Sequence, residues 1–173
     1  MMEGMVTELF DRSIGAKVSA PMMRMTWEDA MDKYGSDKPD LRFDMQLMNL
    51  SEVVRGSDFK VFKSILENGG QVKAINVKGY AAIPRRELDG LVDYVGNYGA
   101  KGLAWFQYAE EGLKSPIKKF FSDEILAKIQ AATKAETGDL LLIIADKPSV
   151  VAHALGELRL EMARRRNLID PDK

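Results

Sequence analysis

The sequence feature that most restricts the fold is an unbroken run of six apolar residues, Leu140 to Ala145. A run this short and continuous predicts a strand that is buried on both faces at the centre of a sheet. Gly138 and Asp139 precede the run as a turn, and Pro148 begins a helix that continues to about Arg166. The body of the fold is therefore expected to be built around a sheet.

The segments before this run alternate between strand and helix signals. Three of them have the composition or the alternation of strands: residues 43–47, 72–77 and 103–108. The first alternates apolar and polar side chains, which predicts a half-buried strand or the lead into one. Residues 59–65 are ambiguous between a strand and a helix, and residues 114–121 between a strand and a turn.

Helical signals lie between these strands. Pro84 starts an amphipathic stripe that ends near Gly96, and Ser122 caps a further helix in which Glu124 and Lys128 are spaced for an ion pair. The helices are too few to cover both faces of a parallel sheet. We therefore expect an α+β fold with two layers, in which helices pack on one face of a mostly antiparallel sheet.

Two shorter helices are predicted before residue 43. Apolar residues recur at helical spacing from Met5 to Ile14, and Gly15 is the stop signal. Thr26 with Asp29 forms a capping box that opens a helix from Trp27 to about Lys33. Because a helix as short as the first is rarely stable alone in water, we expect it to be part of something larger.

The composition limits the kinds of site that this chain can carry. Its 173 residues are 46% hydrophobic, enough for one core, and 25 Lys and Arg against 26 Asp and Glu give a net charge of −1. Any RNA contact must therefore come from a local basic patch. With no Cys and one His, disulfides and thiolate metal sites are excluded, and no metal site is predicted. No apolar run or signal peptide directs the chain to a membrane, so the cytoplasm is the expected location.

Several motifs suggest chemistry, but each has a structural alternative. Residues 96–102 contain two Gly-x-x-Gly units of the kind that KH domains use on RNA, yet they lead from a helix to a strand, which favours a helix end and turn. His153 has no second His or Cys to work with. Arg164–Arg166 either meets phosphate or complements a helix dipole, and the aromatic residues at 105–108 either stack on bases or fill the core. No combination of residues predicts catalysis.

One turn stands out between the helical and the alternating parts of the chain. Gly35 permits a positive φ, Pro39 fixes its own φ, and Ser36, Asp37 and Asp40 can accept hydrogen bonds from nearby backbone amides. From physical chemistry alone, this segment is a well-formed chain reversal.

The order of residues in this turn adds a family resemblance. Residues 34–43, Tyr-Gly-Ser-Asp-Lys-Pro-Asp-Leu-Arg-Phe, resemble the segment by which bacterial-type aspartyl-tRNA synthetases leave their class II catalytic domain and enter an insertion called the GAD domain. The B subunit of the glutamyl-tRNA amidotransferase shares this domain. Further segments are similar to successive GAD signatures: residues 59–62, 84–89, 99–105, 115–120, 138–140, 145–147 and 154–159. The last of these, with the Leu-Ile-Asp exit at residues 168–170, resembles the synthetase more than the amidotransferase.

The resemblance implies both a domain organisation and a fold. Residues 1–42 would be a helical connector derived from the catalytic domain, residues 43–147 the GAD insertion with a DCoH-like α+β core, and residues 148–173 a C-terminal helix returning to the catalytic domain. The family's anticodon-binding domain, class II motifs and aspartate- and ATP-binding residues have no counterpart here. We therefore expect a non-catalytic fragment without cofactors. Its parent would bind ATP and Mg elsewhere, activate aspartate and charge tRNA.

The partners that the resemblance implies are tRNA and the remainder of the synthetase catalytic domain, with a monomeric fragment and a homodimeric parent. The candidates for tRNA contact are the cations inside family-like motifs: Lys38, Arg42, Lys101, Lys119 and Arg159. The alternative is that these cations form structural ion pairs. At the level of the whole chain, the alternative is a freestanding RNA- or protein-binding module of the GAD type, as in the amidotransferase B subunit.

Overall fold

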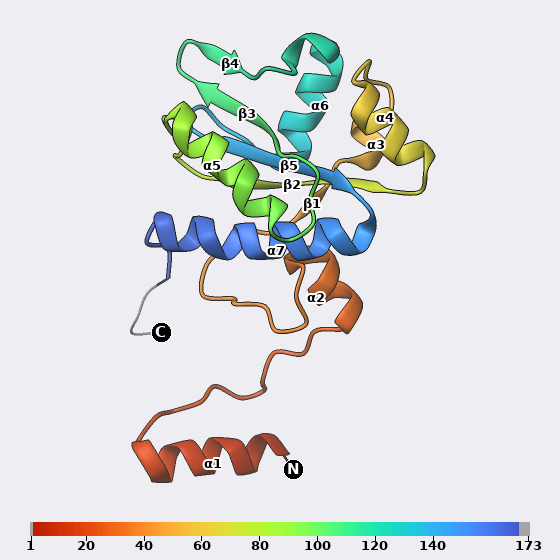
Figure 1. Ribbon diagram of the computed structural model, residues 1–173. Helices are drawn as coiled ribbons and strands as arrows, with labels where there is room; N and C mark the ends of the chain where they lie inside the picture. The colour runs from red at the N-terminus through yellow and green to blue at the C-terminus, as the bar shows by residue number, and fades with distance from the viewer. Residues whose placement is uncertain (1, 170–173) are drawn as a thin grey trace.

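A five-stranded antiparallel sheet lies at the centre of the fold, with the strand order β1-β2-β5-β3-β4 (Figure 1). The computed structural model describes residues 2–169. The strands are β1 (Met48–Asn49), β2 (Gln71–Val77), β3 (Ala104–Ala109), β4 (Gly112–Lys114) and β5 (Leu140–Asp146). Strand β5 pairs with β2 over its full length and with β3 on its other side. The apolar run therefore forms the central strand that the sequence predicts.

Seven α-helices and one 3-10 helix complete the described part of the chain. They are α1 (Met2–Ile14), α2 (Trp27–Tyr34), α3 (Ser51–Val54), α4 (Lys60–Glu67), α5 (Arg85–Gly96), η1 (Lys118–Phe120), α6 (Asp123–Thr133) and α7 (Pro148–Arg165). Both predicted caps are confirmed, because Thr26 accepts from the amide of Asp29 and Ser122 from that of Ile125. The predicted Glu124–Lys128 ion pair forms at 2.6 Å.

The α+β class and the antiparallel sheet are confirmed, but the helices cover both faces of the sheet rather than one. Helices α5 and α7 pack against one side of β5, where Leu140, Leu142 and Ile144 point, and α3, α4 and α6 pack against the other, where Leu141 and Ile143 point. Helix α6 was predicted but not assigned to this face, and residues 59–65, which form most of α4, were ambiguous in the sequence.

The alternating segment before β1 does not pair as a strand. Its apolar residues Phe43, Met45 and Leu47 are buried on the α7 side of the sheet, as the alternation predicts. The amide of Leu47, however, donates to the carbonyl of Lys33 at 2.7 Å instead of joining a ladder. Only Met48 and Asn49 pair with β2, so the segment is the lead into a strand.

Helix α1 lies apart from the rest of the structure, at the bottom of the view in Figure 1. None of its residues is buried, and Met5 and Leu9 are 62% and 60% exposed. Gly15, with φ of 67°, ends the helix where the sequence predicts. No helix within residues 2–169 is long and apolar enough to cross a membrane. Of the predicted C-terminal segment, residues 170–173 lie outside the described residues.

Candidate functional site

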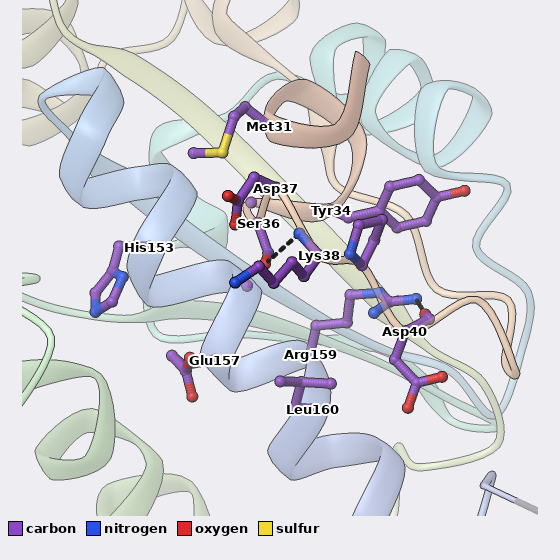
Figure 2. A pocket seen from close by; sticks show the side chains of 13 residues that line it. Met31, Tyr34, Ser36, Asp37, Lys38, Asp40, His153, Glu157, Arg159 and Leu160 are labelled. Carbon is purple, nitrogen blue, oxygen red and sulfur yellow. Dashed lines mark hydrogen bonds between the residues drawn. The ribbon is translucent and has the colours of Figure 1, made fainter. Parts of the chain in front are cut away.

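The turn that carries the family resemblance packs against α7 and, with it, lines a hollow of about 290 Å³ (Figure 2). The turn contributes residues 34–40, and α7 contributes His153, Gly156, Glu157, Arg159 and Leu160. We call this contact region, residues 34–47 with residues 152–159, the turn–α7 junction. Segments more than 100 residues apart in sequence therefore meet here.

Local hydrogen bonds shape the turn as the sequence predicts for Ser36 and Asp40, while the side chain of Asp37 accepts none among the described residues. Gly35 adopts φ of 71° and ends α2, and its amide donates to the carbonyl of Met31 at 3.1 Å. Ser36 Oγ accepts from the amide of Lys38 at 3.1 Å, and Asp40 Oδ1 accepts from the amide of Arg42 at 3.0 Å. These side-chain oxygens accept hydrogen bonds from backbone amides that have no partner in a helix or strand and would otherwise bind water.

Two glycines allow the turn and α7 to touch backbone to backbone. A Cβ atom on Gly35 would collide with the carbonyl oxygen of Ala152 and lie 3.1 Å from the Cα of Gly156. A Cβ atom on Gly156 would lie 3.0 Å from the carbonyl oxygen of Gly35. Any side chain at either position would push the two segments apart.

Arg159 fills the space beside this contact and is almost completely buried, with 1% of its surface exposed. Its Nη2 donates to the carbonyls of Asp40 and Phe43 at 2.7 and 3.3 Å, and its Nε donates to the carbonyl of Met45 at 2.5 Å. The guanidinium lies 4.0 Å from the centre of the Phe43 ring. Burial lowers the pKa of Arg159, but the charge is used entirely inside the protein.

A second buried cation attaches α2 to the sheet. The side chain of Lys73 on β2 is only 5% exposed, and its Nζ donates to Asp32 Oδ1 at 2.5 Å and to the carbonyl of Asp32 at 2.8 Å. With Arg159, this bond holds α2 and the turn against the body of the fold. Sequence analysis missed Lys73; its one signal is a lysine in the middle of an apolar strand, at a position that points to the α7 side.

Two other candidate cations belong to the turn. Arg42 is held by Asp40 in a two-bonded ion pair, with Nε to Oδ1 at 3.0 Å and Nη2 to Oδ2 at 2.8 Å. The hydrogen bond from Arg42 is the main reason that the pKa of Asp40 falls to about 2. Lys38 is exposed at the rim of the hollow and has no ion-pair partner among residues 2–169.

The remaining two candidates lie elsewhere. Lys101 is exposed in the turn after α5, next to Ala100, which belongs to the core on the α5 and α7 side. Lys119 is exposed on η1, on the opposite side of the sheet, with its Nζ 5.1 Å from the centre of the Phe120 ring. The five candidates therefore do not form one patch. Arg159 must be corrected outright, because a buried guanidinium that donates to three carbonyls cannot reach a phosphate.

The other motifs named from the sequence have structural surroundings in the fold. The glycine-rich residues 96–102 end α5 and turn at Gly99, which has φ of 88°. Arg164 and Arg165 both pair with Glu161, at 3.4 and 2.8 Å. Trp105, Phe106 and Tyr108 are buried in the sheet, and His153 is an exposed residue whose ring contacts Tyr98. Within residues 2–169, no three acidic or His side chains are grouped to hold a metal ion.

Comparison with known proteins gives one family and a consistent set of relatives. The GAD domain family matches residues 62–155. An aspartate–tRNA(Asp/Asn) ligase of Heliobacterium modesticaldum is 54% identical over 173 residues, which are 100% of this chain and 29% of that protein. An aspartate–tRNA ligase of Clostridium perfringens is 53% identical over 167 residues, 96% of this chain and 28% of that protein. An aspartate–tRNA(Asp/Asn) ligase of Bacillus cereus is 52% identical over 174 residues, 100% of this chain and 29% of that protein. The chain thus spans less than a third of the length of these relatives.

Proposed function

This chain belongs to the GAD domain family, and we propose that it acts as the GAD-containing part of a bacterial-type aspartate–tRNA ligase. The observation that carries the proposal is the 54% identity to such a ligase over all 173 residues. The similarity therefore includes α1, α2 and the turn, which lie outside the matched GAD segment of residues 62–155. A freestanding module would need only the GAD segment, so this breadth favours the ligase.

In the proposed whole enzyme, aspartate is activated with ATP and transferred to tRNA in the cytoplasm, by a homodimer. ATP and Mg bind outside residues 1–173, and this chain supplies neither a catalytic residue nor a cofactor site. Residues 1–42 connect to the catalytic domain, residues 43–147 form the insertion, and residues 148–173 return. In this division the turn–α7 junction lies where the two crossings between the domains meet, and its hydrogen bonds and close backbone contact tie them together.

The insertion also contacts tRNA in this proposal. Three of the cations selected from the sequence are exposed and have no ion-pair partner among the described residues: Lys38, Lys101 and Lys119. Arg42 is largely neutralised by Asp40, and Arg159 is excluded by burial. Since the net charge is −1, such contacts depend on a local group of cations.

The test is binding of a tRNA(Asp) transcript to the 173-residue chain at low and moderate salt, with aspartate-dependent ATP–pyrophosphate exchange measured beside it. Salt-sensitive binding without exchange is the expected result. Exchange by this chain alone would contradict the assignment of catalysis to the rest of the enzyme. An absence of tRNA binding would contradict the RNA contact and leave the insertion a purely structural part.

A further inference from the structure

One of the exposed cations, Lys119, lies within a group that the sequence does not reveal. Lys118 and Lys119 lie in η1, and Lys60 and Lys63 lie in the first turn of α4, more than 50 residues earlier. All four side chains are exposed. We call these four residues the lysine cluster.

The core beneath the cluster brings its two halves together. The rings of Phe59 and Phe120, which directly adjoin Lys60 and Lys119 in sequence, have their centres 5.4 Å apart. The amide of Asp58 donates to the carbonyl of Phe120 at 3.0 Å, so the two backbones touch. Lys60 and Lys63, three residues apart on a helix, share one flank of α4. In Figure 1, α4 lies on the side of the sheet away from α5 and α7.

The lysine cluster differs from its surroundings in having no ion pairs. None of its four lysines pairs with another residue between 2 and 169, whereas Arg55, Lys114 and Lys128 each pair with a glutamate at 2.7, 3.1 and 2.6 Å. Along the chain, three acidic residues lie within four positions of these lysines, Asp58, Glu67 and Asp123. The four lysines outnumber them. The local charge is therefore positive on a chain whose net charge is −1.

Apart from the contact between Lys119 and the Phe120 ring, the structure shows no gain in stability from these charges. Cations in the first turn of a helix oppose the helix dipole, and α4 has no acidic residue there to offset Lys60 and Lys63. Four ammonium groups in one area also repel one another. Four lysines without an ion pair among the described residues, two of which oppose a helix dipole, are suited to an external polyanion.

We propose that the lysine cluster is the surface through which this domain contacts the phosphate backbone of RNA; this inference rests on the proposed function. Flexible lysine side chains suit phosphates, which they meet as point charges without reading bases. The partly exposed Phe59 and Phe120 form an apolar floor beneath these side chains. Lys38 and Lys101 then lie outside the main contact surface.

The test compares two charge-reversed variants of the 173-residue chain for binding to a labelled tRNA(Asp) transcript. Lys118→Glu/Lys119→Glu changes the cluster, and Arg86→Glu/Lys147→Glu makes the same change in net charge at exposed positions at the starts of α5 and α7. We expect the cluster variant to bind about 10-fold or more weakly, and its slope of log affinity against log salt to fall by about 1.5. The control variant should stay within about 3-fold of the parent. Circular dichroism melts check that both variants fold.

Each other outcome overturns the proposal in a distinguishable way. Equal losses of tRNA affinity in the two variants would show that only net charge matters. Unchanged affinity in the cluster variant would place the contact elsewhere. In both cases the proposed RNA-binding role would remain. Failure of the unmodified chain to bind tRNA would overturn both the cluster and the proposed RNA contact. Binding of polyglutamate as tight as that of tRNA, lost in the cluster variant, would assign the surface to an acidic protein instead.

Discussion

The turn–α7 junction and the lysine cluster both contain cations, but they use them in opposite ways. At the junction, Arg159 is buried, donates to three backbone carbonyls and packs on an aromatic ring. In the cluster, Lys118 and Lys119 are exposed and have no ion-pair partner within the described residues. Charge at the junction thus holds two segments together, whereas charge in the cluster remains available to a ligand.

The largest expected effect is at Arg159. Replacing it with Leu removes the side-chain donors to the carbonyls of Asp40, Phe43 and Met45, and should lower the free energy of unfolding by about 4 kcal/mol. Urea unfolding measures the loss. Arg164→Leu, which removes an exposed pair with Glu161, is the control and should cost less than about 0.5 kcal/mol. Similar losses in both variants would mean that the junction does not depend on its buried charge.

The next effect comes from the backbone contact itself. Gly35→Ala places a methyl group against the carbonyl of Ala152 at a positive φ of 71°, and should cost about 3 kcal/mol. Gly69→Ala is a matched control, because its φ is 75° but its Cβ would have no atom within 4 Å. That variant should lower the free energy of unfolding by only about 1 kcal/mol, which is the cost of placing a side chain at a positive φ without a steric clash. Equal losses would show that close packing of the turn on α7 contributes nothing.

These two positions show what the sequence can and cannot predict about the site. Most of the turn was predictable, because Gly35, Ser36 and Asp40 act on neighbours a few residues away. The role of Arg159 was not, since its partners lie 114 to 119 residues earlier and depend on how α7 packs. A basic residue in a family-like motif gives no sign of whether its charge faces solvent or the core.

The same division holds for the rest of the fold. The central strand and both side-chain caps follow from local pattern, and all are found where they were predicted. The second helical layer was missed because local pattern does not say which face of the sheet a helix covers: α6 was predicted as a helix, and only residues 59–65 were ambiguous. The lysine cluster was missed for a related reason, since its halves approach only when Phe59 packs on Phe120.

A smaller effect should appear as a pH dependence at the junction. The ion pair with Arg42 holds the pKa of Asp40 at about 2, below its ordinary value of 3.8. The stability from this pair is therefore complete above about pH 4 and is lost as the pH falls toward 2. Solvent screens the pair, so the contribution is about 1 kcal/mol at most. Asp40→Asn should lose that amount at pH 6 and little at pH 2.5 in urea unfolding; a loss independent of pH would assign the effect to packing.

The smallest predicted effect has the opposite sign and separates the two regions most sharply. Lys60→Gln removes a cation from the first turn of α4 and from its lysine neighbours, so it should raise the free energy of unfolding by about 0.3 kcal/mol. Lys128→Gln, which breaks the pair with Glu124, should lower it slightly. If Lys60→Gln instead lost stability, the cluster would contribute to the fold as Arg159 does. A gain in stability together with weaker tRNA binding would show that these lysines oppose folding and serve the ligand alone.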